Sequence, residues 1–233
     1  MTHTITIARR FNGPPESGNG GYAAGVMAQR IGQPVHVRLQ RPIPLDAPLS
    51  LREQADRWEA YDGDQLIALA RPPVRAVPPL PVRPSFDQAH ACLRDQPAAD
   101  STSAFTGCFV CGMSRAEGDG LRLAAGRIAD DVVAAPWTPH EVFANADGEV
   151  EPEYVWAALD CPGMFAAFPD GRYALLGELA VELLQPVHAR EPHVVVGWLI
   201  ARDGRKRTAG TALIDAAGAC RAQAIATWIQ LER

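Results

Sequence analysis

The segment VHVRLQRPI at residues 35–43 lies over LAVELLQPV at residues 179–187 with a constant offset of 144 positions. Pro48 lies over Pro192 at the same offset, so the match extends beyond the segment. A repeat at a fixed offset indicates that one structural unit occurs twice in a chain. We therefore predict that residues 35–43 and 179–187 are equivalent strands in two copies of one unit.

The first copy reads as a strand, one helix and then a meander of strands. Runs of alternating apolar residues predict the strands, and the glycine-rich turn GPPESGNGG (13–21) leads into a stretch with helical spacing. Asp62-Gly63 is a typical hairpin turn between the last two strands. The predicted elements are a strand at 4–8, a helix at 22–31, and strands at 35–41, 49–61 and 65–71.

The second copy shows the same order of signals. Pro152 suits the first position of a helix, where its missing N–H removes no hydrogen bond. A strand is predicted before this helix at 132–135, and strands follow it at 174–184, 193–203, 207–215 and 220–231.

A proline-rich segment separates the two copies. Residues 72–97 contain seven prolines, and because proline lacks a backbone N–H we do not expect this segment to form a strand inside a sheet. A short helix with Ser85 as its N-cap fits within it. We predict a first unit at 1–72, a linker at 73–107 and a second unit at 108–233.

The amino-acid composition makes some classes of function improbable. The chain has 233 residues, 47% of them hydrophobic, and 27 acidic against 22 basic side chains give a net charge of −5. A mildly acidic chain without a long basic block is a poor partner for nucleic acid. No apolar run reaches the ~18 residues that a membrane span needs, and the sequence MTHTITIARR lacks the core of a signal peptide. We expect a globular cytoplasmic protein.

FNGPPESGNGGYAAG (11–25) and CFVCGMSRAEGDGLRL (108–123), together with the repeated pattern of strand, helix and meander, resemble segments of a thioesterase-like hotdog family. The resemblance implies an α+β chain with a tandem (double) hotdog fold, in which antiparallel sheets each wrap a central helix. It also implies an acyl thioester bound between the paired units. Coenzyme A would then be part of the substrate, with no further cofactor. We also predict a homodimer through sheet edges or helices, because dimerisation would bury more apolar surface.

The glycine-rich turn is a candidate binding element. Residues 18–23 formally fit a dinucleotide fingerprint, but no strand leads directly into them and antiparallel hairpin signals follow, so a nucleotide site is disfavoured. The backbone amides of Gly20, Gly21 and Tyr22 at the helix start could instead hold the oxyanion formed when a thioester is attacked. Equally, the glycines could only permit close packing, with Asn19 as an ordinary N-cap.

Glu178 is one candidate for the catalytic base. It lies on a mostly apolar predicted strand, and its equivalent in the first copy is Pro34, as expected for one composite site per chain. The resemblance to double-hotdog acyl-CoA thioesterases implies a catalytic carboxylate on this strand, helped by hydroxyl or amide side chains of the neighbouring strands. Thr208 or Thr211, and Thr227 or Gln223, would face it. The alternative is a solvated glutamate on an edge strand.

Asp160 is the second candidate base. An aspartate near the C-terminus of a helix is disfavoured by the macrodipole, so its presence needs a reason. The resemblance to hotdog thioesterases, which often place an acid on the central helix, implies catalysis. The other reading, which the position of Pro162 favours, is that Asp160 caps a new helical turn through Met164 and Phe165.

Aromatic residues around the second helix are candidates for binding an acyl chain. We assign this role to Trp156 and Phe165, although side chains of this kind also build an ordinary core. The remaining members of the group are Trp137, Phe143 and Phe168.

The five cysteines do not predict a disulfide framework, because their number is odd and the chain lacks secretory features. Cys108 and Cys111 have a metal-like spacing, but a structural zinc site needs four ligands, and the nearest candidates are His90 and Cys92. We therefore predict no metal and a reduced pair.

The leading prediction is hydrolysis of an acyl-CoA or acyl-carrier thioester. Helix N-terminal amides would polarise the carbonyl, and Glu178 or Asp160 would activate water. A rival is a binding protein that holds an acyl ligand without turning it over. A hydratase or dehydratase ranks last, because such enzymes usually use an aspartate–histidine pair and no histidine here is suitably spaced from an acid.

Overall fold

Strands with alternating apolar residues build the first half of the chain around one helix. The computed structural model describes residues 2–73, 76–94, 105–171 and 173–231. The helix begins where Asn19 Oδ1 accepts the Tyr22 N–H (2.8 Å) and ends at Gly32, which takes the left-handed conformation (φ 75°). The elements of this half are β1 (Thr2–Thr6), η1 (Arg9–Phe11), α1 (Gly20–Ile31), β2 (His36–Leu39), β3 (Pro48–Glu53), β4 (Trp58–Asp62) and β5 (Gln65–Arg71).

The second half has longer strands and a broken helix. Pro152 is the first residue of its first helical segment, as the sequence predicts, and Pro162 lies in the first turn of the next. The elements are β6 (Gly126–Ala129), β7 (Val132–Trp137), η2 (Glu141–Phe143), α3 (Pro152–Ala158), α4 (Cys161–Ala167), β8 (Ala174–Leu183), β9 (His193–Asp203), β10 (Lys206–Asp215) and β11 (Cys220–Gln230).

The described strands form one sheet of eleven, in the order β1-β3-β4-β5-β2-β8-β11-β10-β9-β7-β6, and every pair in it is antiparallel. β2 and β8, which carry the repeated segment, are neighbours, with Val37 opposite Leu179. We call the boundary between β2 and β8 the seam. Outward from it, the strands of the first half follow in the order β2, β5, β4, β3, β1, and those of the second half in the order β8, β11, β10, β9, β7. The strand after the helix thus lies at the seam in both halves, and the α+β class with antiparallel strands is confirmed.

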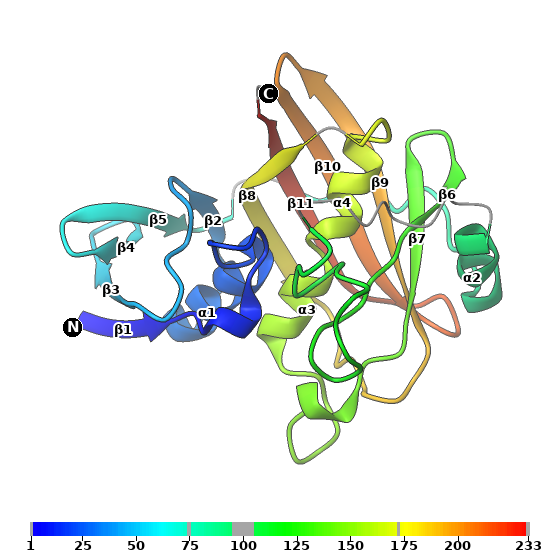
Figure 1. Ribbon diagram of the computed structural model, residues 1–233, viewed down its shortest axis with the longest axis horizontal. Helices are drawn as coiled ribbons and strands as arrows, with labels where there is room; N and C mark the ends of the chain where they lie inside the picture. The colour runs from blue at the N-terminus through cyan, green and yellow to red at the C-terminus, as the bar shows by residue number, and fades with distance from the viewer. Residues whose placement is uncertain (1, 74–75, 95–104, 172, 232–233) are drawn as a thin grey trace.

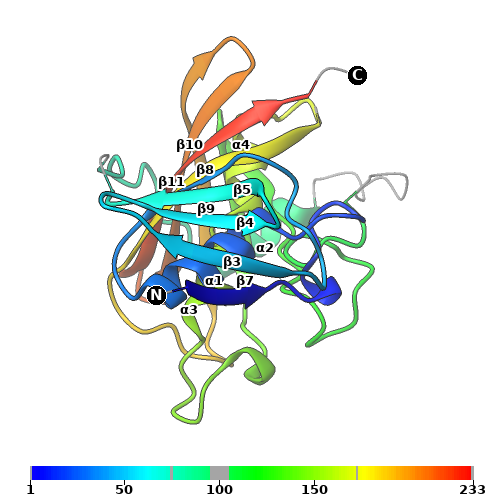
Figure 2. The same ribbon diagram turned by 90° about the vertical axis from the view of Figure 1, so that its left-hand side faces the viewer.

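The helices α1 and α3 contact each other on one side of the seam between β2 and β8 (Figure 1). Seen from the first half, α1 lies behind β3, β4 and β5 (Figure 2). Glycines allow the close approach: a Cβ on Gly25 would lie 2.7 Å from Glu153 Cα, and one on Gly21 would lie 2.6 Å from Asp160 Cβ. Larger side chains at these two positions of α1 would push the halves apart.

The proline-rich segment contributes the helix α2 (Phe86–Arg94). Ser85 Oγ accepts the Gln88 N–H and Gln88 Oε1 accepts the Ser85 N–H, which forms a capping box and confirms Ser85 as the N-cap. Ala89 is buried with Ala134 and Val196, on the face of the second half's sheet opposite α4. Residues 74–75 and 95–104 of the predicted linker lie outside the described residues.

One element prediction is wrong. The single strand predicted at 49–61 is two strands, β3 and β4, because the polar stretch from Gln54 to Arg57 turns the chain, with the Gln54 N–H donating to the Arg57 carbonyl (2.8 Å). β6 was also not predicted from the sequence. Among the described residues, no helix has the length and apolar character needed to cross a bilayer.

Candidate active site

A cavity of about 450 Å³ lies where the N-terminus of α1, the end of β2 and the start of β8 come together. A larger cavity, of about 730 Å³, lies at the other end of α1, between Gly32 and the start of α3. We assign the site to the smaller one, because two of its residues, Asp160 and Trp228, each have a buried polar atom with no partner among the residues that the structure describes. Such atoms point to a polar ligand or water, since buried polar groups are normally hydrogen-bonded.

Asp160 is the central residue of this cavity. It lies between α3 and α4, and it is only 2% exposed. Its Oδ2 accepts hydrogen bonds from Asn19 Nδ2 (2.8 Å) and from the Gly21 N–H (3.0 Å). Its Oδ1 is buried and has no partner among the described residues. The second half thus presents a carboxylate to the N-terminus of α1, where the helix dipole favours negative charge.

Burial raises the pKa of Asp160 to about 7, while the hydrogen bonds from Gly21 and Asn19 oppose part of that rise. The cause is desolvation, which disfavours the charged form of a carboxyl group. The group can therefore both accept and release a proton close to neutral pH.

The capping role that we preferred for Asp160 is wrong. Its side chain makes no capping hydrogen bond to α4, although α4 does begin at Cys161 beside Pro162. The carboxylate bonds to α1 instead. The proline breaks the helix, and the break lets the side chain of Asp160 reach the first half.

The amides at the start of α1 have different tasks. The Gly21 N–H bonds to Asp160 and the Tyr22 N–H bonds to Asn19 Oδ1, so neither is available for an oxyanion. The Gly20 N–H donates to no acceptor among the described residues, and Gly20 lines the cavity. Each of the two roles predicted for the glycines therefore applies to a different residue. Gly21 allows close packing and binds the Asp160 carboxylate, whereas Gly20 has an N–H group that no described acceptor uses.

Trp228, on β11, is a cavity residue that sequence reasoning missed. Its side chain is buried, and its indole Nε1 has no partner among the described residues. A Cβ on Gly163 would lie 3.2 Å from this nitrogen, so α4 passes close to it. The sequence signal was present only as a tryptophan on an apolar strand, which is typical of any core.

The structure places Glu178 away from the cavity. A β-bulge at Gly177 shifts the register, so that Thr227 lies opposite Glu178 but Trp228 lies opposite Leu176. One extra residue moves the following side chains to the other face of a sheet. Leu176 and Leu179 both face the core, whereas Glu178 points to the opposite face.

Glu178 takes part in an ion-pair cluster across the seam between the halves. Its carboxylate lies 3.5 Å from His36 Nε2 and 3.7 Å from Arg38 Nε, and Thr227 Oγ1 is within 3.5 Å. Thr208 lies opposite Thr227 in the register, so the three side chains that we grouped from the sequence do share one row of the sheet. That row is not the cavity lining.

The other sequence candidates lie in three places. Trp156 is buried and lines the larger cavity. Phe165 packs half-buried against the core and lines neither cavity. Tyr22 is buried, and its ring stacks on Phe11 with centroids 3.9 Å apart. Its ring belongs to an aromatic cluster beside α1 rather than to the lining of the smaller cavity.

Two cysteines line the same cavity as Asp160. Cys108 and Cys161 are buried with their sulfurs 4.0 Å apart, and Cys111 lies beside them. Hydrogen bonds from the thiols of Cys111 and Cys161 lower the pKa of the Cys108 thiol well below its usual value.

The fold matches two solved structures over nearly the whole chain. The tesB protein MAP1729c of Mycobacterium avium subsp. paratuberculosis superposes with a TM-score of 0.65 at 13% identity, covering 99% of this chain and 93% of that one. This chain has a thioesterase-like hotdog fold. A second match is a protein of Novosphingobium aromaticivorans described as a "putative thioesterase", with a TM-score of 0.63, 14% identity and coverage of 99% of this chain and 96% of that one.

No family model matches the sequence, and a search of curated proteins found no match. The hotdog assignment therefore rests on the structure, and at these identities it concerns the fold alone.

Proposed function

We propose that this chain is a tandem pair of hotdog units that hydrolyses an acyl thioester of coenzyme A or of an acyl carrier in the 450 Å³ cavity. The observation that carries the proposal is that two buried side-chain atoms of the cavity residues, the acceptor Asp160 Oδ1 and the donor Trp228 Nε1, have no partner in the described part of the chain. The Gly20 N–H, at the start of α1, also donates to no described acceptor. A thioester carbonyl and a water molecule together offer the complementary groups.

The tandem arrangement is supported by the strand order. Both halves run from the seam outward in the same sequence of equivalent strands, and the repeated segments β2 and β8 pair with each other. The cavity takes Asn19 and Gly20 from one half and Asp160 from the other. Two units in one chain can thus form one composite site.

The cavity suits an acyl chain in size and lining. Its volume of about 450 Å³ falls within the range of small-molecule sites, about 300–1,000 Å³. Apolar side chains make up much of its wall, including Leu39, Ile43, Met164 and Leu176. Burial of the acyl group would supply binding energy, and the few polar atoms would orient the carbonyl.

In the proposed reaction, the Gly20 N–H, at the positive end of α1, donates to the thioester carbonyl oxygen. Asp160 Oδ1 accepts a proton from a water molecule as the water oxygen bonds to the carbonyl carbon. The tetrahedral intermediate then collapses, the carbon–sulfur bond breaks, and the sulfur leaves with the bonding electrons. Asp160 returns the proton, so the products are a carboxylic acid and a thiol, and no group of the protein is consumed.

The geometry favours hydrolysis over the hydratase alternative. Among the described residues no histidine lines the cavity, so Asp160 has no histidine partner there. The binding-protein alternative needs the same apolar cavity, and turnover separates it from the enzyme.

The test is a panel of acyl-CoA and acyl-N-acetylcysteamine thioesters of different chain lengths and aromatic content, with the released thiol and acid separated by chromatography. We expect catalytic release from a subset whose acyl groups fit the cavity. Calorimetric titration of the same compounds supplies the contrast. Tight binding of acyl thioesters without release of thiol, across the whole panel, would identify a binding protein and reject the enzyme.

A further inference from the structure

Three cysteine sulfurs converge beside the cavity. Cys108 and Cys111 come from the loop before β6, and Cys161, 53 positions after Cys108 in the sequence, begins α4. All three sulfurs lie within 4.8 Å of one another, and those of Cys108 and Cys161 are 4.0 Å apart. The sequence pair thus has a third member that spacing alone could not reveal.

The loop around Cys108 is shaped to hold its sulfur in place. The Cys161 thiol is in hydrogen-bond contact with the Cys108 thiol, and the Gly112 N–H donates to the Cys108 carbonyl (2.9 Å). A Cβ on Gly112 would lie 2.4 Å from that carbonyl oxygen, so the tight turn needs glycine. From the first half, Asn19 Nδ2 lies 4.0 Å from the same sulfur. Side chains from both halves therefore contact one sulfur atom.

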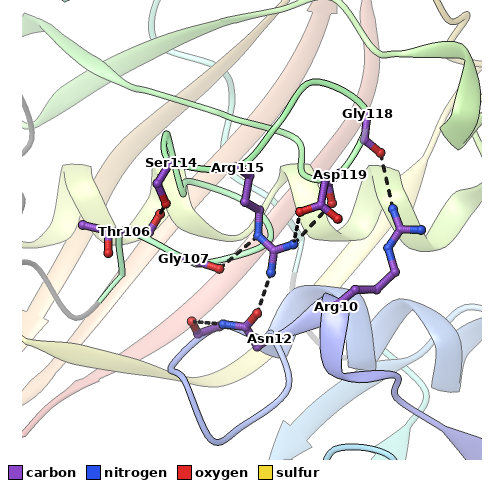
Figure 3. Close-up of polar contacts among 9 residues, drawn as sticks. Arg10, Asn12, Thr106, Gly107, Ser114, Arg115, Gly118 and Asp119 are labelled. Atoms are coloured by element: carbon purple, nitrogen blue, oxygen red, sulfur yellow. Dashed lines mark hydrogen bonds and ion pairs between the residues drawn. The ribbon is translucent and has the colours of Figure 1, made fainter.

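Arg115 makes hydrogen bonds within this loop and also to the first half of the chain (Figure 3). Its guanidinium donates to the Gly107 carbonyl (2.9 Å), to Asp119 Oδ2 (2.9 Å) and to Asn12 Oδ1. The Phe109 N–H adds a backbone bond to the Asn12 carbonyl (2.7 Å). The cysteine pair is consequently held in a fixed position relative to α1 and Asp160, as a preorganised ligand set requires.

The Cys108 and Cys161 sulfurs, 4.0 Å apart, are spaced close to two ligands of a single tetrahedral ion. Zinc–sulfur bonds of about 2.3 Å at tetrahedral angles put two thiolates about 3.8 Å apart. Soft thiolate ligands select zinc over magnesium or calcium. A polar donor beside a sulfur ligand, such as Asn19 Nδ2 beside the Cys108 sulfur, is typical of the outer shell of such a site.

We propose that Cys108, Cys111 and Cys161 bind one zinc ion through three thiolates. The fourth position faces the cavity that Cys108, Cys161 and Asp160 line together, and a solvent molecule completes it. Binding releases the protons of the three thiols to solvent, with no change of oxidation state. The ion would tie the loop of the second half to the start of α4 and so hold the segment that carries Asp160. This inference does not rest on the proposed function, because metal content is measured without substrate.

The experiment measures zinc by mass spectrometry in the full chain, purified with a phosphine reductant and without a histidine tag. We expect one zinc ion per chain in the wild type, and most of it lost in Cys111→Ser and Cys161→Ser. Cys92→Ser and Cys220→Ser are matched controls, since these cysteines lie on α2 and β11, outside the cluster, and both should keep the metal. Equal loss of zinc from the control variants would assign the metal to adventitious thiol binding and overturn the proposal.

Cobalt titration of metal-free wild type keeps the test decisive if the cluster variants do not fold. Tetrahedral thiolate coordination gives intense visible bands and a sulfur-to-cobalt charge-transfer band in the near ultraviolet, saturating at one equivalent. A reduced, folded wild type that holds no zinc and shows none of these bands with cobalt would overturn the proposal.

Discussion

Replacing Gly21 with alanine should separate the two halves at the active site. The added Cβ would lie 2.6 Å from Asp160 Cβ and 3.0 Å from the Trp156 carbonyl oxygen, against an ordinary contact of about 3.5–4.0 Å. α1 must therefore move by about 1 Å, which lengthens the 3.0 Å bond from the Gly21 N–H to Asp160 Oδ2 beyond hydrogen-bond range. Overpacking costs about 1–3 kcal/mol, and the better helix propensity of alanine offsets up to about 1 kcal/mol of that.

We expect Gly21→Ala to lower the free energy of unfolding by about 1–2 kcal/mol in urea titrations. Turnover of the best thioester should fall more steeply, about 10²-fold, because a displacement of 1 Å disturbs the position of the base. Gly107→Ala is the control, since a Cβ there meets no described atom within 4 Å and should change neither quantity. A Gly21→Ala protein with wild-type turnover would refute the placement of Asp160 against α1.

Three further outcomes follow from the same structure. Glu178→Gln should keep wild-type turnover and lose at most about 1 kcal/mol of stability in urea, because its partner Arg38 is half-exposed and such ion pairs are weak. Arg41, exposed at the cavity rim, should bind the phosphates of coenzyme A, so Arg41→Ala should raise KM for acyl-CoA but not for acyl-N-acetylcysteamine in steady-state kinetics. Burial lowers the pKa of His193, so stability should fall as the pH drops below about 6.5, where the unfolded state gains a proton that the folded state resists. Urea titrations at several pH values should show a weaker loss in His193→Gln.

Much of the fold could be predicted because its signals are local. Alternation placed β9 at its observed bounds, and Pro152 marked the first residue of α3. The repeated segment lies on β2 and β8, which the structure shows as paired neighbours. The hairpin between β3 and β4 was missed because the short polar stretch at 54–57 interrupts an alternation that continues on both sides of it.

The site was harder to predict, because its residues meet only in three dimensions. Asp160 could be selected from the sequence because an acid near the C-terminus of a helix is unfavourable. Only the structure shows that its carboxylate faces the N-terminus of α1. The bulge at Gly177, which turns Glu178 to the other face, leaves no clear mark in the sequence. Cys161 could not be linked to Cys108 by spacing. Dimerisation through the sheet edges, formed by β1 and β6, stays a prediction, as do the unit boundaries and a cytoplasmic location.

The most direct measurement is the turnover number of Asp160→Asn on the best thioester of the panel. Asparagine has nearly the same shape and can still accept the Gly21 N–H through its side-chain oxygen, but it cannot take a proton from water. We expect turnover to fall by about 10²–10⁴-fold, with the circular dichroism spectrum unchanged. Hydrolysis at the wild-type rate by a folded Asp160→Asn protein would contradict the account.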